Sequence, residues 1–116
     1  MIPIIYGIPN CDKIRKARKW LDGHKITHEF VDLRAKPPSR VQVSQWLEAV
    51  GASNLINRRS TTWREMSDTK REEAQHGDVI AVLCDNPTLI RRPVMEYEDN
   101  IMVGFLEGDY ARCFCT

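Results

Sequence analysis

Cys11 stands where a cysteine side chain can act as a nucleophile. The apolar run IPIIY stops at Gly7 and Pro9, and the basic, helix-like segment DKIRKARKWL begins directly after Cys11. A thiol at the start of a helix lies near unpaired backbone N–H groups and the positive end of the helix dipole, which both favour the thiolate. Because the thiolate attacks disulfides and oxyanions, we expect Cys11 to be the catalytic nucleophile. The structural alternative is a small buried residue at the end of a strand.

The residues around Cys11 bear on this expectation. Lys13 and Arg15 are close in the sequence and add positive charge. Asp12 opposes the thiolate unless it pairs with one of these basic side chains. Either Asn10 or Cys11 is expected to cap the helix, so Asn10 is a second candidate residue of the site.

The spacing of the four cysteines leaves Cys11 without a neighbouring thiol. A thioredoxin-type C-x-x-C motif needs a second cysteine at position 14, where the sequence has Ile14. Cys11 therefore needs Cys84, Cys113, Cys115 or an outside thiol such as glutathione to resolve a mixed disulfide. The cysteines and histidines also lack the paired spacing of a zinc site, so we expect no bound metal.

Two arginine pairs are the candidate anion-binding residues. Arg91-Arg92 precedes Pro93, and Arg58-Arg59 stands in a polar loop. The planar guanidinium group binds carboxylates and oxyanions with two parallel hydrogen bonds, although an arginine pair on its own is more often a solvated surface. In a thioredoxin-like fold, a proline at this place packs beside the active cysteine, commonly after a cis peptide bond, and would bring Arg92 with it. Neighbours on a strand point to opposite faces, so Arg91 is the alternative.

Length and composition favour one globular domain over residues 1–116. The chain has 42% hydrophobic and 28% charged residues, which is ordinary for a soluble protein. A net charge of +1 gives no support for binding to nucleic acid or to a membrane. The apolar runs are too short to span a bilayer, and no signal-peptide pattern opens the chain. We therefore expect a cytoplasmic protein with reduced cysteines.

The order of elements predicts an α/β fold. The first half alternates strand and helix, with a strand over 1–6, a helix over 12–23, a strand over 26–33, and a helix that Ser39 caps and Gly51 ends. The second half has short helical pieces over 63–77, a hairpin of 93–97 with 101–105, and a last helix over 107–113. Residues 78–84 fit either a strand or a short buried helix. This is the thioredoxin order, βαβ then ββα, with helices inserted over roughly residues 39–90.

Five longer segments of the sequence are informative together: IYGIPNCDKIRKARKWL, HEFVDLRAKPPS, LINRRSTTWREM, NPTLIRRPVMEY and MVGFLEGDYA. In their order and spacing they resemble the arsenate reductase (ArsC)/Spx family of bacterial proteins, most closely its YffB-like branch. Together they span nearly the whole chain. The resemblance implies a thioredoxin-like fold with a helical insertion and a redox-active cysteine at position 11.

The resemblance also implies roles for single residues. In arsenate reductases of this family the cysteine attacks arsenate, arginines bind the oxyanion, and glutathione with glutaredoxin completes the reduction. Arg92 matches one of these arginines, and another falls within the segment 57–59. A further family arginine in the last strand has no counterpart here, because the stretch MVGF occupies its place. This departure argues against arsenate as the substrate. YffB-like proteins are usually described as glutathione-dependent thiol reductases.

Two functions of different classes follow. The first is a glutathione-dependent thiol/disulfide reductase, with glutathione as co-substrate, glutaredoxin as a further partner and no bound cofactor. The second is an Spx-like regulator that binds the α subunit of RNA polymerase without catalysis. Many Spx proteins carry a C-x-x-C redox switch, and Ile14 removes that switch here. Neither function requires direct contact with nucleic acid or with a membrane.

Overall fold

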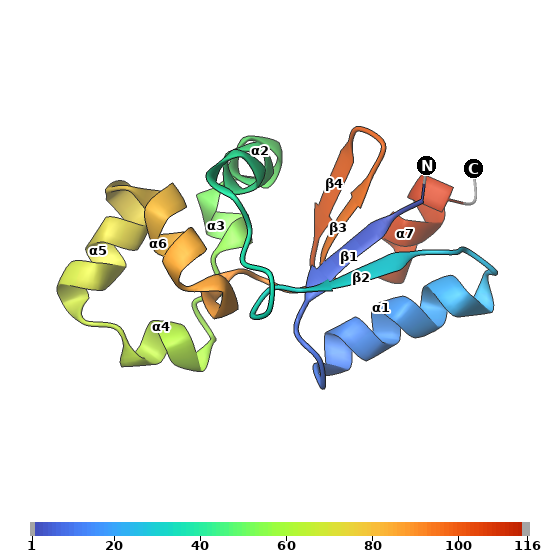
Figure 1. The fold of residues 1–116 in the computed structure, drawn as a ribbon, viewed down its shortest axis with the longest axis horizontal. Helices are drawn as coiled ribbons and strands as arrows, with labels where there is room; N and C mark the ends of the chain where they lie inside the picture. Colours follow the sequence, from blue (N-terminus) through green and yellow to red (C-terminus); the bar gives the residue numbers. More distant parts are fainter. Residues whose placement is uncertain (1, 115–116) are drawn as a thin grey trace. The chain divides into compact units, whose positions relative to one another are not determined.

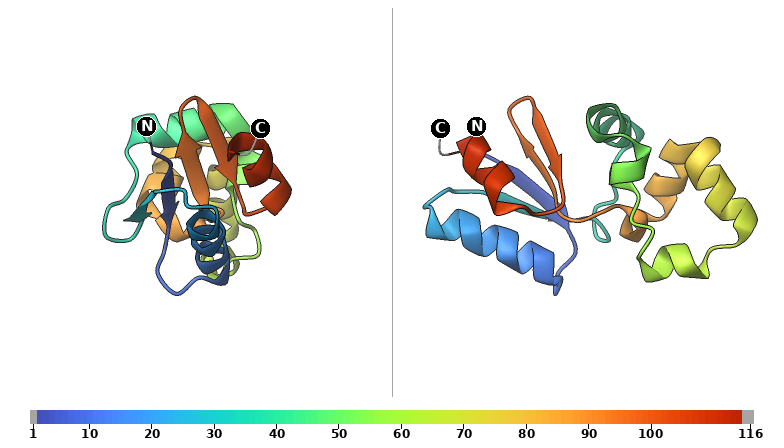
Figure 2. Two further views of the ribbon diagram at one scale, coloured as in Figure 1. Left: turned by 90° about the vertical axis from the view of Figure 1, so that its right-hand side faces the viewer. Right: turned by 180° about the vertical axis from the view of Figure 1, so that it is seen from behind.

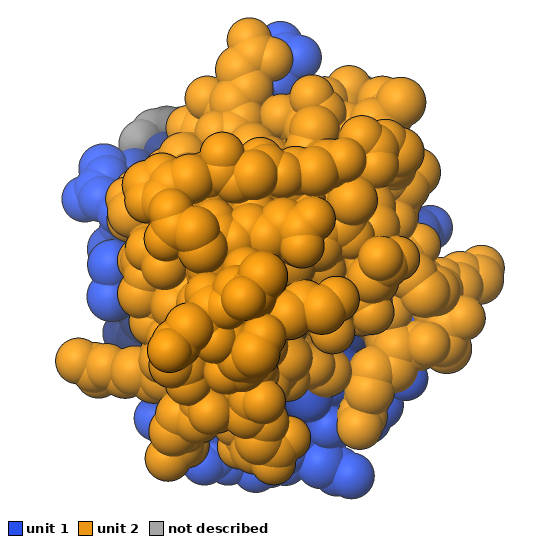
Figure 3. Space-filling model, turned by 90° about the vertical axis from the view of Figure 1, so that its left-hand side faces the viewer, with its two compact units in different colours: residues 1–32, 92–116 blue, residues 33–91 orange. Residues whose placement is uncertain are grey.

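The chain forms two compact units in a computed structural model that describes residues 2–114. Unit 1 joins the chain up to Asp32 with the chain from Arg92 onward, and unit 2 is Leu33–Arg91 (Figure 3). Unit 2 covers the stretch that the sequence predicts as a helical insertion. The single domain over residues 1–116 stays a prediction.

A four-stranded sheet forms the centre of unit 1. Its strands are β1 (Ile4–Gly7), β2 (Glu29–Asp32), β3 (Val94–Tyr97) and β4 (Asn100–Val103), in the order β2-β1-β3-β4. β1 and β2 are parallel, whereas β3 runs antiparallel to both β1 and β4. The predicted parallel pair and the predicted hairpin are therefore both confirmed.

Two helices cover one face of this sheet. Helix α1 (Asp12–Gly23) connects β1 to β2, and helix α7 (Glu107–Phe114) follows β4 (Figure 1). Apolar residues recur every three or four positions along α1, so they share one side of the helix. The core that they form with the sheet and α7 consists of Ile5, Ile14, Ala17, Leu21, Met95 and Tyr110. Each fully buried aliphatic side chain contributes about 1.5–3 kcal/mol, so this core fixes α1 firmly against β1.

Unit 2 is mainly helical. Its helices are α2 (Arg40–Val50), α3 (Ala52–Leu55), α4 (Thr61–Glu65), α5 (Asp68–His76) and α6 (Val79–Asp85), followed by the 3₁₀ turn η1 (Pro87–Leu89) (Figure 2). Ser39 caps α2 as predicted, in a reciprocal pair of hydrogen bonds with Gln42, and Val43 and Trp46 are fully buried. No helix within residues 2–114 is long and apolar enough to cross a membrane.

The segment 78–84 forms a helix, not a strand. The Asp78 carboxylate accepts a hydrogen bond from the backbone N–H of Ala81 at 3.1 Å and so caps α6. Val82 and Leu83 lie on the buried side of this helix. The β-branched residues of the segment are compatible with a strand, but the cap and the length of the buried run favour the short helix.

Candidate active site

The loop after β1 places Cys11 at the first position of helix α1. Gly7 ends the strand, and Asn10 adopts the left-handed backbone conformation with φ 62°, which asparagine tolerates better than most residues. Cys11 is extended and is the N-cap residue, and its carbonyl oxygen accepts the backbone N–H of Arg15 at 3.0 Å. The Cys11 side chain makes no capping hydrogen bond and is half-buried against the core of unit 1.

The charged residues of the first helical turn are paired with each other. The Arg15 guanidinium donates a hydrogen bond to the Asp12 carboxylate, and both side chains are exposed. Of the two alternatives that the sequence leaves open for Asp12, the structure has the pairing with a basic neighbour. Because Asp12 is paired in this way, its negative charge is partly compensated beside the Cys11 thiol, which lies at the positive end of the helix dipole.

Strand register brings Arg92 and Pro93 to the same end of the sheet as the Cys11 loop. The Arg92–Pro93 peptide bond is cis, as predicted. Tyr6 pairs with Val94 in the antiparallel pair of β1 and β3. The residues before Val94 therefore lie at the end of the sheet where the chain leaves β1 for Cys11. The Pro93 carbonyl accepts a hydrogen bond from the backbone N–H of Gly104 at 2.9 Å, which joins the start of β3 to the end of β4.

The hydrogen-bond partners of Arg91 belong to unit 2. Its Nε donates to the backbone carbonyl of Asn54 at 2.8 Å, and its backbone N–H donates to the carbonyl of Leu55 at 2.7 Å. Of the neighbouring arginines, Arg92 belongs to unit 1 and is half-buried there. A substrate role of Arg91 stays a prediction, and its observed contacts are structural.

Arg58 and Arg59 follow a short antiparallel pairing of two segments of unit 2, in which Ile56 lies opposite Ile90. Arg58 donates to the Gln75 side chain at 3.4 Å and lies over the Trp63 ring at 5.6 Å. Arg59 is exposed. Since the paired segments are antiparallel, Arg58 and Arg59 leave the pairing at the end opposite to Arg91. Unit 2 thus does not bring its three candidate arginines together, and their binding roles stay predictions.

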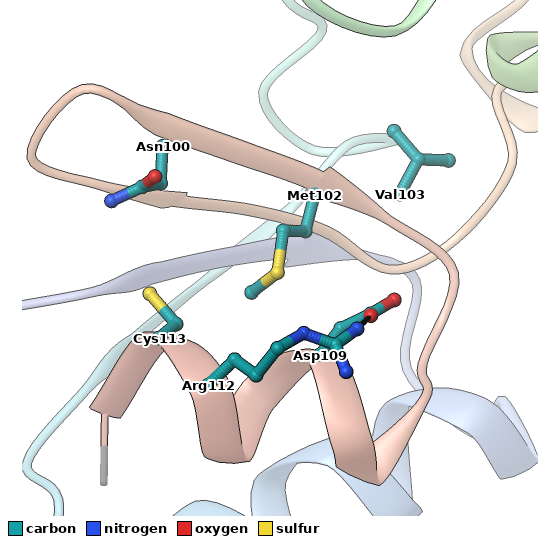
Figure 4. Close-up of a pocket in the computed structure, with 6 residues that line it drawn as sticks. All are labelled: Asn100, Met102, Val103, Asp109, Arg112 and Cys113. Atoms are coloured by element: carbon teal, nitrogen blue, oxygen red, sulfur yellow. Dashed lines mark hydrogen bonds and ion pairs between the residues drawn. The ribbon is translucent and has the colours of Figure 1, made fainter. Parts of the chain in front are cut away.

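The other described cysteines are free thiols in different surroundings. Cys113 of α7 lines a cavity of about 380 Å³ with Asn100 and Met102 of β4 (Figure 4). Burial, with a smaller contribution from Glu98, raises the pKa of Cys113 above its usual 9.0. Asn100 lies at the end of the sheet where β1 begins, so Cys113 is at the end opposite to the loop of Cys11.

Cys84 and Cys115 are the other two candidate resolving thiols. Cys84 is a free thiol on α6 in unit 2, and burial raises its pKa. Cys115 lies outside the described residues. Among residues 2–114, no group of three or more His, Cys, Asp and Glu side chains could hold a metal ion.

Comparison with known proteins decides the family. The model of the ArsC family matches residues 6–113. The chain belongs to the ArsC family. An uncharacterized protein of Haemophilus influenzae is 36% identical over 95% of this chain and 96% of its own length. The global transcriptional regulator Spx of Streptococcus pyogenes is 32% identical over 93% of this chain and 81% of its own length. The solved structure of the protein YffB has a TM-score of 0.89 at 33% identity, over 95% of this chain and 96% of that chain.

These matches confirm the predicted thioredoxin-like ArsC fold and the YffB-like branch. Cys11, Arg92 and Pro93 all lie within the residues that the family model matches, and their roles in a site stay predictions. The last strand, β4, has the sequence NIMV and so offers no arginine to that site. Asn10 is the alternative N-cap that the sequence offers, but Cys11 takes the N-cap position. Asn10 instead adopts a left-handed backbone conformation where the chain turns into the helix.

Proposed function

We propose that this protein is a thiol/disulfide reductase in which Cys11 is the only catalytic thiol and glutathione resolves the intermediate. The observation that carries the proposal is the position of Cys11 as the N-cap residue of helix α1, with a side chain that makes no capping hydrogen bond. Cys11 lies at the same end of the sheet as Arg92 and cis-Pro93. The expected cytoplasmic location, where glutathione keeps thiols reduced, belongs to the same proposal.

The reaction has two exchange steps. In the first, the Cys11 thiolate attacks the glutathione sulfur of a mixed disulfide R–S–S–G, which forms a Cys11–S–S–G bond and releases R–S⁻ to take up a proton. In the second, the thiolate of another glutathione attacks the glutathione sulfur on Cys11 and leaves as oxidised glutathione, so that the Cys11 thiol is restored. One disulfide of the substrate is reduced for each glutathione disulfide formed.

Arg92 is proposed to hold the anionic part of the substrate, such as a carboxylate of glutathione. It is half-buried and belongs to the same unit as Cys11. A guanidinium group there would form paired hydrogen bonds with a carboxylate, which an ammonium group cannot reproduce. Arg92→Lys is therefore expected to keep part of the charge effect and to lose the paired geometry. Further contributions from Arg58, Arg59 or Arg91 are separate proposals, and single alanine variants would test each one.

The test is turnover of a glutathione mixed disulfide of a small thiol by the purified protein. Glutathione reductase and NADPH would report the glutathione disulfide that forms. Cys11→Ser is expected to abolish turnover, and Cys113→Ser is the matched control that should retain it. Arg92→Ala should raise KM for the mixed disulfide about tenfold, in line with the loss of a charge-assisted hydrogen bond. Turnover that persists in Cys11→Ser would contradict the proposal.

Arsenate is the secondary substrate to test in the same assay. The absence of an arginine from β4 leaves less positive charge for a multiply charged oxyanion. We expect slow or undetectable arsenate reduction under conditions in which the mixed disulfide is turned over.

The second candidate function is transcriptional regulation, and the similarity to Spx supports it. Spx of Streptococcus pyogenes is 32% identical to this chain and is a global transcriptional regulator. Binding to the α subunit of RNA polymerase would then be the activity. Retention of purified α subunit on the immobilised chain, together with an inactive Cys11, would place this candidate first.

A further inference from the structure

A groove lies between helix α1 and the segment that starts helix α7. Its volume is about 470 Å³, and all of its lining residues belong to unit 1. They are Lys16, Lys19, Trp20, Gly23 and His24 of α1, with Phe105 and Glu107 of the segment that starts α7. The lining begins at Lys16, more than one helical turn beyond Cys11. The groove is therefore separate from the candidate active site.

The apolar walls of the groove are held in place by the core. Trp20 stacks on His24 with ring centroids 3.9 Å apart and meets the buried Tyr110 edge-on at 5.6 Å. Phe105 meets the same Tyr110 ring edge-on at 4.9 Å. Since Tyr110 is fully buried, both walls are anchored to a rigid residue. Next to Phe105, the Leu106 side chain is 66% exposed, which extends the apolar surface beyond the groove.

Two lysines of helix α1, Lys16 and Lys19, line the groove. Helix α1 has five basic and two acidic residues, although the whole chain has a net charge of only +1. Arg15 pairs with Asp12, and Arg18 lies over the Phe30 ring at 5.0 Å. Within residues 2–114, the side chains of the lining residues Lys16 and Lys19 form no ion pair or hydrogen bond.

We propose that this groove binds an acidic segment of a partner protein that carries an apolar side chain between its carboxylates. The apolar side chain would contact Trp20 and Phe105, and the carboxylates would pair with Lys16 and Lys19. The Glu107 carboxylate also lies on the lining and would repel any anion, so the carboxylates of the segment are expected on the side of Lys16 and Lys19, away from Glu107. A net charge of only +1 on the whole chain gives no support for a nucleic-acid backbone as the occupant. The proposal does not depend on the redox role of Cys11.

Gly23 offers a way to block the groove without damage to the fold. A Cβ atom at this position would meet no heavy atom within 4 Å, and no left-handed backbone conformation is needed there. Gly23→Glu would place both bulk and negative charge in the groove. Gly23→Gln adds the same bulk without the charge, and Gly23→Ala adds neither.

The experiment is an NMR titration of the reduced, ¹⁵N-labelled full chain with the capped peptide acetyl-Glu-Asp-Leu-Glu-Glu-Phe-Asp-Glu-amide. Amide shifts at Lys16, Lys19 and Gly23 are expected to follow one binding curve. Lys16→Glu and Lys19→Glu should each weaken binding about fivefold, since an exposed ion pair is replaced by repulsion. Lys13→Glu is the matched control, because Lys13 lies on the same helix and does not line the groove. It should change the affinity by about twofold or less.

Further arms decide between occupants. Peptides in which serine replaces Leu and Phe, or Gln and Asn replace the acidic residues, should bind at least about fivefold more weakly. Gly23→Glu should bind more weakly than Gly23→Gln, and Cys11→Ser should bind as the parent does. The proposal is overturned if the shifts fall outside the groove or are absent at millimolar peptide. It is equally overturned if oligothymidylate or anionic phospholipid vesicles bind these residues more tightly than the peptide does.

Discussion

The contact between Gly7 and Ile14 should make the start of the active-site loop intolerant of even one methyl group. A Cβ atom at Gly7 would lie 2.1 Å from Cδ1 and 2.8 Å from Cγ1 of Ile14, both far below normal contact. Ile14 is only 3% exposed and packs in the core of unit 1, so its side chain has little room to move. Overpacking of this kind typically costs about 1–3 kcal/mol. We therefore expect Gly7→Ala to lower the free energy of unfolding by about 2 kcal/mol.

A double-mutant cycle isolates this contact. Ile14→Val removes the Cδ1 atom that lies nearest and alone should cost about 1 kcal/mol. In Gly7→Ala/Ile14→Val the nearest overlap is removed although Cγ1 stays 2.8 Å from the new methyl group, so the double variant should regain only part of the loss and be more stable than the sum of the single losses by about 1 kcal/mol. Urea unfolding followed by circular dichroism measures all four proteins. A Gly7→Ala variant within about 0.5 kcal/mol of the parent, or an additive cycle, would refute the close contact.

Three further predictions concern the packing of both units. Ser39→Ala removes the capping box with Gln42 and should cost unit 2 about 1 kcal/mol in urea unfolding, whereas Ser39→Gly should cost less. Arg71 donates a hydrogen bond to the backbone carbonyl of Trp63 at 3.0 Å, and its guanidinium lies over the Trp63 ring. Arg71→Lys should therefore lower the free energy of unfolding by about 1–2 kcal/mol and change Trp63 fluorescence. An unchanged stability and spectrum would contradict those contacts. Burial raises the pKa of Tyr110 above its usual 10.0, so its contribution to stability is present below about pH 10 and is lost as the pH rises further. Tyr110→Phe should reduce this loss of stability at alkaline pH. At pH 7 it should leave the free energy of unfolding unchanged or raise it, because the buried hydroxyl has no hydrogen-bond partner within residues 2–114. A decrease of more than about 1 kcal/mol at pH 7 would count against this reasoning.

The sequence predicts most of unit 1 because its signals are local. Periodicity placed the helix over 12–23, and the turn residues before Asn100 placed the hairpin. The segment 78–84 stayed ambiguous, since apolar β-branched residues suit a strand and a short buried helix equally well. The Asp78 cap resolves it in the structure, through a hydrogen bond to Ala81.

The candidate site was predictable in part. Cys11 is predicted by its place between a strand and a helix. Arg92 with cis-Pro93 is predicted by the thioredoxin-like order of the elements, and the resemblance of the segments adds a match for Arg92. The hydrogen bond from Arg91 to Asn54 joins residues far apart in the sequence, and no local pattern indicates it. The same holds for the groove beside α1, whose walls come from segments far apart in the sequence that both pack on the buried Tyr110.

The most direct test of the central claim is to map the thiol that forms the glutathione intermediate. The reduced chain would be mixed with glutathione disulfide, quenched with acid at short times and analysed by peptide mass spectrometry. We predict that one glutathionyl group appears on Cys11 first, and that added glutathione removes it at least as fast as the protein turns over the mixed disulfide. A first adduct on Cys84, Cys113 or Cys115, or an adduct on Cys11 that glutathione does not release, would contradict the claim.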